Sequence, residues 1–253
     1  MILQESVSLA DGSRIPRLGL GTWLMDDAGA AAAVQTAVQL GYRLLDTAQA
    51  YGNERGVGEG MRACGVPRSQ LFIGSKIAAE CKTHDAAAAS IDTTLEKMGL
   101  DYLDQMIIHS PQPWTEFGTE NRYFAENREV WRALEEAQAA GKVRVIGVSN
   151  FRQDDLESLL AGCRVRPMVN QILLHVGRTD AALLEYCRAQ KIAVEAYSPI
   201  AHGAAVQNPW IVQMAARYGV SAAQLCIRYV LQLGAVALPK ASGAAHLQSN
   251  AAV

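Results

Sequence analysis

Eight short apolar runs, each followed by a segment with helical periodicity, constrain the fold of this chain more than any other feature. Runs of this kind are typical of strands buried on both faces of a parallel sheet. One run and its helical segment occupy roughly the ~30 residues of a βα repeat. The runs are "RLGLGTW" (17–23), "YRLLDTA" (42–48), "LFIGSK" (71–76), "DQMIIH" (104–109), "VRVIGVSN" (143–150), "PMVNQ" (167–171), "IAVEAYS" (192–198) and "AVALPK" (235–240).

The segments between the runs carry apolar residues at helical spacing. This spacing recurs over residues 30–38 and 91–98, and Gly99 ends the second of these predicted helices. Residues 183–187 present one further apolar face. Ser221-x-x-Gln224 has the form of a capping box and predicts the start of another helix.

The number of repeats and the chain length favour one (β/α)8 TIM barrel of the α/β class, in a single domain spanning residues 1–253. Asp11-Gly12 predicts the turn of an N-terminal β-hairpin. The alternative is a doubly wound sheet, which would carry a Gly-rich turn after its first strand. The glycines of "GVGEGM" (56–61) have the wrong spacing for that turn and follow a polar segment.

Charge and hydropathy narrow the possible partners. The formal net charge of -2 and the pI near 6.2 provide no basic surface for nucleic acid or anionic lipid. No run of about 20 apolar residues could span a bilayer, and residues 1–16 lack the pattern of a signal peptide. Five scattered cysteines indicate neither a zinc site nor a disulfide framework. We therefore expect a cytoplasmic protein that holds no metal. Its expected partner is a small molecule.

Polar side chains collect at the ends of three consecutive apolar runs. Asp46 and Tyr51 follow the second run, Lys76 ends the third and His109 ends the fourth. Singly, each has a plain structural explanation, as a cap, a packed aromatic ring, a solvated ammonium or a hydrogen-bonded imidazole. In a (β/α)8 barrel, however, these strand ends meet at the face that carries the active site. Their convergence predicts a catalytic centre.

The chemistry of these residues suits acid catalysis. A phenol with a pKa near 10 is a poor proton donor at neutral pH. An ammonium such as that of Lys76, held charged by Asp46, is expected to lower the pKa of Tyr51 by roughly 1–3 units. A carbonyl oxygen hydrogen-bonded to His109 would then be protonated once hydride reached its carbon. None of these groups supplies hydride, so the reaction requires a redox cofactor.

The motifs resemble those of the aldo-keto reductase family, in order, from about residue 6 to 250. Within that family the chain is similar to bacterial members of the 2,5-diketo-gluconate reductase kind. The resemblance implies an oxidoreductase that reduces aldehyde or ketone carbonyls to alcohols with NAD(P)H. The matching stretches are "GLGTW" (19–23), "DTAQAYGNE" (46–54), "SK" (75–76), "IIH" (107–109), "GVSNF" (147–151), "NQ" (170–171), "AYSP" (196–199) and "LPK" (238–240).

The resemblance also implies a role for each matching residue. Tyr51 is the expected proton donor, Lys76 and Asp46 tune it, and His109 orients the carbonyl. Tyr197 is expected to stack on the nicotinamide ring. The expected substrate residues are Trp23, Tyr51, His109, Ser110 and Trp114. The expected cofactor residues are Gly21, Thr22, Asp46, Ser149, Asn150, Gln171, Tyr197, Ser198, Ile200, Lys240, Ser242, His246 and Asn250.

The chain departs from the family pattern around both ligands. Where the family often has Trp after the strand-end His, this chain has Ser110, with Trp114 four residues further on. The chain stops at Val253, so we expect a shortened C-terminus and a wide substrate pocket. Lys240 is present, but His246 stands where an arginine for the adenosine 2′-phosphate is expected. NADP(H) should therefore be preferred by a reduced margin, with NAD(H) also possible.

Two other functions are compatible with parts of this pattern. An NADP(H)-binding redox sensor or regulatory subunit could use the same barrel with little turnover. A phosphate-binding lyase or isomerase has weaker support, because no second strand-end lysine is placed for a Schiff base and no carboxylate cluster suggests a metal. The substrate stays open among aldehydes, diketones and keto-sugars, and a monomer is the expectation from the family.

Overall fold

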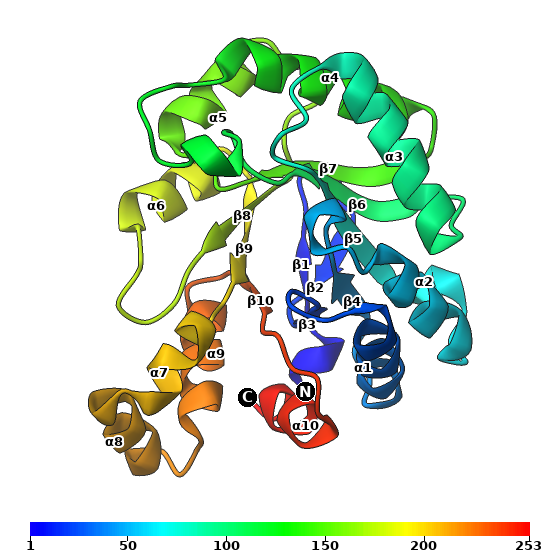
Figure 1. Cartoon of the computed structure of the whole chain (residues 1–253). Helices are drawn as coiled ribbons and strands as arrows, with labels where there is room; N and C mark the ends of the chain where they lie inside the picture. Colours follow the sequence, from blue (N-terminus) through cyan, green and yellow to red (C-terminus); the bar gives the residue numbers. More distant parts are fainter.

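The computed structural model describes residues 1–253 and contains an eight-stranded parallel barrel. Figure 1 shows the strands arranged in chain order with helices around them. Parallel bridges from Leu18 to Ala237 and from Gly21 to Lys240 join the first barrel strand to the last. The predicted barrel is confirmed, and each of the eight apolar runs coincides with one strand. The strands are β3 (Gly19–Gly21), β4 (Leu44–Asp46), β5 (Phe72–Ile77), β6 (Leu103–Ile108), β7 (Val143–Ser149), β8 (Val169–Leu173), β9 (Ala193–Tyr197) and β10 (Val236–Leu238).

Local signals in the sequence set several helix ends. Ser221 and Gln224 form the predicted capping box at the start of α9, with bonds of 3.2 and 2.9 Å. Gly99 ends α3 with a left-handed φ of 64°. The helices are α1 (Asp27–Gln39), α2 (Glu54–Ala63), α3 (His84–Met98), α4 (Phe124–Ala139), α5 (Gln153–Leu160), α6 (Ala181–Ala189), α7 (Ala204–Gln207), α8 (Pro209–Arg217), α9 (Ala222–Gln232) and α10 (Ala244–Ala251), with short 3-10 turns at Ile2–Gln4, Gln49–Tyr51, Arg68–Gln70, Trp114–Glu116 and Ala201–Gly203.

The glycines of "GVGEGM" lie inside α2 and serve helix packing. A Cβ atom at Gly56 would lie 2.1 Å from the carbonyl oxygen of Asp27, and one at Gly58 would lie 2.3 Å from that of Met98. Helix α2 therefore approaches α1 and α3 closely enough that only glycine fits. This close approach explains the glycines without a phosphate-binding turn.

The N-terminal hairpin covers one end of the barrel. Strands β1 (Ser6–Ser8) and β2 (Arg14–Pro16) pair antiparallel, and Gly12 in the connecting turn has a φ of 86°. Ile15 of this hairpin is fully buried and belongs to a core cluster that includes Leu44 and Val145. The hairpin therefore closes the N-terminal end of the barrel and leaves the C-terminal strand ends open. No helix is long and apolar enough to cross a membrane.

Candidate active site

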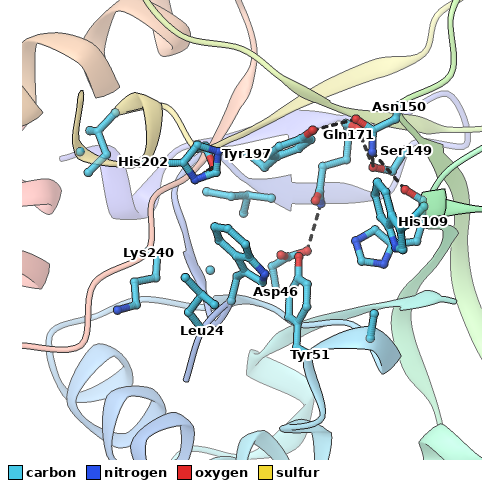
Figure 2. Close-up of a pocket in the computed structure, with 18 residues that line it drawn as sticks. Leu24, Asp46, Tyr51, His109, Ser149, Asn150, Gln171, Tyr197, His202 and Lys240 are labelled. Atoms are coloured by element: carbon cyan, nitrogen blue, oxygen red, sulfur yellow. Dashed lines mark hydrogen bonds between the residues drawn. The ribbon is translucent and has the colours of Figure 1, made fainter. Parts of the chain in front are cut away.

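A pocket of about 730 Å³ opens at the C-terminal ends of the barrel strands. In Figure 2, Lys240 and His202 lie at one end of it, His109 and Asn150 lie at the other, and Tyr51 lies between them. The volume falls within the range of small-molecule and cofactor sites. The lining residues are Gly21, Trp23, Leu24, Asp46, Ala50, Tyr51, His109, Trp114, Ser149, Asn150, Gln171, Tyr197, Ser198, Ile200, His202, Gly203, Leu238 and Lys240.

Lys76 is the centre of the predicted catalytic group. Its ammonium lies 2.9 and 2.8 Å from the two carboxylate oxygens of Asp46 and 2.7 Å from the carbonyl oxygen of Thr47. It also lies 3.3 Å from the hydroxyl oxygen of Tyr51. Lys76 is fully buried, so protein acceptors replace water around its charge. The structure thus brings together the acid, the amine and the phenol that the sequence placed on adjacent strand ends.

A short turn fixes the position of Tyr51. The side chain of Gln49 donates to the hydroxyl of Thr94 and to the carbonyl of Ser90, both at 3.1 Å, and accepts from the amide of Ala78 at 2.8 Å. These bonds tie the 3-10 turn Gln49–Tyr51 to α3 and to the end of β5. Sequence reasoning missed Gln49, because nothing in the local pattern indicates which distant groups its amide reaches.

Burial and charge act in opposite directions on the buried ion pair. Burial disfavours the Lys76 ammonium, but Asp46 and Tyr51 outweigh this effect and hold the pKa of Lys76 above its usual value. Burial also raises the pKa of Tyr51, and Asp46 adds to the rise while Lys76 opposes it. The expectation that Lys76 would bring the pKa of Tyr51 below 10 is therefore wrong for this structure. Desolvation of the phenol exceeds the stabilisation of phenolate by the ammonium.

His109 is buried at the pocket wall and is neutral. Burial and the nearby positive charge of Lys76 lower its pKa to about 2. Its ring meets the ring of Tyr51 edge-on at 5.6 Å and that of Trp114 at 5.1 Å. The Nδ1 atom has no hydrogen-bond partner. A neutral imidazole beside the phenol can donate a hydrogen bond to a substrate oxygen, but it is not a source of acid protons at neutral pH.

A hydrogen-bond network shapes the opposite wall of the pocket. The hydroxyl of Tyr197 donates to Oδ1 of Asn150 at 2.8 Å, and Nδ2 of Asn150 donates to the carbonyl of His109 at 3.1 Å. Ser149 donates to the carbonyl of Gln171 at 2.8 Å. The side-chain nitrogen of Gln171 donates to Asp46 at 3.0 Å, as Figure 2 shows. These bonds hold the aromatic face of Tyr197 and the amide of Gln171 in fixed positions.

Comparison with known proteins identifies the family. The model of the "Aldo/keto reductase family" matches residues 17–253. The chain belongs to this family. It is 39% identical over 239 residues to glyoxal reductase of Bacillus subtilis, covering 94% of this chain and 83% of that protein.

Solved structures of aldo-keto reductases have the same fold. The Brucella melitensis enzyme superposes with a TM-score of 0.89 at 35% identity, covering 97% of this chain and 91% of that one. A Bombyx mori aldo-keto reductase solved with NADP gives 0.86 at 30%, covering 97% and 86%. The chain is thus an NAD(P)H-dependent oxidoreductase that reduces aldehyde or ketone carbonyls, as predicted.

The pocket fits the cofactor of an aldo-keto reductase. Backbone approaches closely at Gly21, where a Cβ would lie 3.2 Å from the carbonyl oxygen of Leu238. Asn150 and Ser198 adopt left-handed φ values of 61° and 50°, which cost conformational energy and turn both residues into the pocket wall. Oε1 of Gln171 accepts no hydrogen bond within the chain and is available to an amide donor. The nicotinamide carboxamide is such a donor.

Five residues predicted for ligand contact lie outside the pocket lining. Thr22 and Ser110 are fully buried; Thr22 donates to the carbonyl of Asp46 at 3.0 Å, and the Ser110 hydroxyl accepts from the amide of Gln112 at 3.3 Å. Their side chains therefore support loops of the site. The other three follow Lys240 toward the C-terminus, where Ser242 and His246 are exposed and Asn250 is buried in α10.

The structure adds pocket residues that sequence reasoning missed. His202 meets the ring of Trp23 edge-on at 5.2 Å, joining the loop after β9 to the loop after β3. His202 and its neighbour Ala201 both have left-handed φ values, 53° and 52°. Leu24, also left-handed at 60°, lies 74% exposed at the rim. No pattern in the sequence marks these residues, since they meet only through loop geometry.

Proposed function

We propose that Tyr51 is the proton donor of carbonyl reduction, with Lys76, Asp46 and His109 in supporting roles. The observation that carries this proposal is the 3.3 Å contact between Lys76 Nζ and the Tyr51 hydroxyl, inside a pocket that His109 also lines. Lys76 is the only cation in contact with that phenol. This contact opposes the effect of burial on the pKa of Tyr51 and favours proton release.

When bound, NAD(P)H would supply hydride to the carbonyl carbon. Negative charge then grows on the carbonyl oxygen, and the Tyr51 hydroxyl transfers its proton to that oxygen to complete the alcohol. Lys76 stabilises the phenolate that remains, and Asp46 keeps Lys76 charged and in place. His109, neutral throughout, donates a hydrogen bond that orients the carbonyl. In alcohol oxidation the same phenolate acts as the base.

Ser149, Asn150 and Gln171 are proposed to hold the nicotinamide carboxamide, and Tyr197 to stack on its ring. Gly21, Ser198 and Ile200 line the same pocket as Lys240, and they are proposed to lie against the ribose and pyrophosphate. Lys240 is proposed to bind the adenosine 2′-phosphate, flanked by Ser242 and His246. These assignments make NADP(H) the preferred cofactor and leave NAD(H) usable.

Aldehydes, diketones and keto-sugars, including those of the 2,5-diketo-gluconate kind, are the proposed substrates. Two features support a carbonyl group on a carbon chain. The mouth carries the apolar surfaces of Trp23 and Trp114, 43% and 40% exposed, which can pack on a carbon chain. The floor carries the polar groups of Tyr51 and His109, which can bind a carbonyl. A cytoplasmic monomer is proposed as the working form.

A panel of carbonyls tests this function, with consumption of NADPH or NADH followed by absorbance. Wild type should reduce dicarbonyls, and Tyr51→Phe should lose roughly 10²–10⁴-fold in turnover while its NADPH dissociation constant stays unchanged. Tyr218→Phe, at a 70% exposed tyrosine away from the pocket, is the matched control and should behave as wild type. Near-normal turnover by Tyr51→Phe would overturn the assignment. NADPH binding without turnover on any carbonyl would instead fit the redox sensor.

A further inference from the structure

A second carboxylate lies inside the barrel beside the catalytic group. Glu195 is on β9, two residues before Tyr197, so both side chains face the barrel interior, with Glu195 the deeper of the two. Glu195 is fully buried. The side-chain nitrogen of Gln171 donates to it at 2.7 Å and also donates to Asp46 at 3.0 Å. One amide nitrogen therefore joins Glu195 directly to the partner of Lys76.

The interior holds too little positive charge for two carboxylates. The groups that face Glu195 are Asp46 from β4, Lys76 from β5, Gln105 from β6 and Gln171 from β8. Lys76 is the single cation among them, and it is already paired with Asp46. Burial and the Asp46 carboxylate raise the pKa of Glu195 to about 7, against hydrogen bonds from both glutamines and the charge of Lys76.

An unpaired atom gives independent support for a proton on Glu195. Nε2 of Gln105 lies 3.1 and 3.0 Å from the two carboxylate oxygens of Glu195, while Oε1 of Gln105 is buried without a partner. Leaving a buried acceptor unpaired is costly. A half-turn of the amide about its terminal bond exchanges its oxygen and nitrogen. In that orientation Oε1 would accept a hydrogen bond from a protonated Glu195, and Nε2 would occupy the place where Oε1 has no partner.

We propose that Glu195 is a positioning residue of the catalytic centre. As a neutral acid it bonds to Gln105, and when it ionises it adds a second negative charge near Asp46 and Lys76. This inference rests on the proposed role of Tyr51. The negative charge of ionised Glu195 offsets part of the stabilisation that Lys76 gives to the phenolate of Tyr51. At pH values where Glu195 is ionised, the phenolate therefore forms less readily. Tyr51 is then kept as the acid for reduction and is disfavoured as the base for alcohol oxidation.

A direct titration tests the protonation of Glu195 without reference to activity. In wild-type protein labelled with ¹³C at the glutamate carboxyl carbons, one resonance should titrate close to neutral pH, far above the ordinary range near 4.3. Glu195→Gln should remove that resonance. Glu54→Gln is the matched control, since Glu54 is also buried and accepts from Ser75 and Thr94 at 2.7 and 3.0 Å. It should leave the neutral resonance in place. Wild-type glutamates that all titrate below pH 5.5 would overturn the inference.

The pH profiles of both reaction directions test the link to catalysis. In Glu195→Gln the pH at which the rate of alcohol oxidation rises should be lower than in wild type by about half a unit to one unit. This change is smaller than a directly adjacent charge produces. The profile of Glu54→Gln should match wild type. Turnover with an unchanged profile in Glu195→Gln would refute the positioning role while leaving the proposed function intact. Absence of turnover in wild type at every pH would refute the proposed function, and the titration would still decide the state of Glu195.

Discussion

The ammonium nitrogen of Lys76 lies 3.3 Å from the hydroxyl oxygen of Tyr51 and is completely shielded from solvent. Burial alone would make the phenol a weaker acid, and this contact is the main influence that opposes burial. Burial lowers the pKa of His109, and the charge of the same ammonium adds to that effect. Burial and one buried charge therefore act together on both side chains that we propose meet the carbonyl.

Lys76→Met should abolish turnover and also destabilise the fold. It removes the cation that favours the Tyr51 phenolate, and it leaves Asp46 buried without its partner, which typically costs 3–5 kcal/mol. Adding Asp46→Asn to Lys76→Met should recover most of the lost stability but none of the turnover. Urea unfolding and steady-state kinetics on the three proteins measure the two effects separately. Equal stability of the single and double variants would contradict the buried-pair explanation.

The fold could be predicted from the sequence because strand and helix periods repeat along the chain. The eight runs, the capping box at Ser221 and the turn at Gly12 are all local signals. The proposed catalytic residues could be brought together from the sequence for a related reason, since parallel strand ends must meet at one face. Glu195 was missed because "IAVEAYS" resembles any apolar strand, and only closure of the barrel brings its carboxylate to Gln171 and Asp46. The direction of the Tyr51 pKa shift was wrong because sequence does not measure burial.

Trp114→Ala should weaken substrate binding more than it slows chemistry. The indole is 40% exposed and meets the His109 ring edge-on at 5.1 Å, so it supplies an apolar wall without touching the proton donor. We expect KM for carbonyls with a carbon chain to rise roughly tenfold, as about 1.4 kcal/mol of apolar contact is lost. The turnover number should change little. Trp210→Ala, at a 79% exposed tryptophan on α8, is the matched control and should leave KM unchanged. A fall in turnover with constant KM would contradict this role.

His246→Arg should strengthen the preference for NADPH over NADH. His246 is exposed near the start of α10, a few residues beyond Lys240, and an imidazole lacks the two-pronged donor geometry that arginine offers a phosphate. NADPH affinity should rise about five- to tenfold, with NADH affinity unchanged. Fluorescence titration of both cofactors into both proteins measures this. An NADPH affinity that stays unchanged in the arginine variant would exclude position 246 from the phosphate site.

Glu195→Gln should stabilise the protein at pH 8 and have little effect at pH 5. The pKa of Glu195 rises from an ordinary 4.5 to about 7 on folding, so the folded state binds its proton more tightly than the unfolded state does. The stability this group provides is complete below about pH 4.5 and is lost as pH rises through 7. The loss is on the order of 3 kcal/mol, at about 1.36 kcal/mol per pKa unit.

Glutamine at position 195 cannot ionise, so its contribution stays constant with pH. Unfolding free energies from urea titrations at pH 5 and pH 8 should therefore diverge between wild type and Glu195→Gln, with wild type losing more stability on the way to pH 8. Glu54→Gln, at another buried glutamate, is the matched control in these titrations. Parallel curves for wild type and Glu195→Gln would mean that Glu195 is already ionised at pH 5. In that case the single ammonium of Lys76 would have to support both carboxylates.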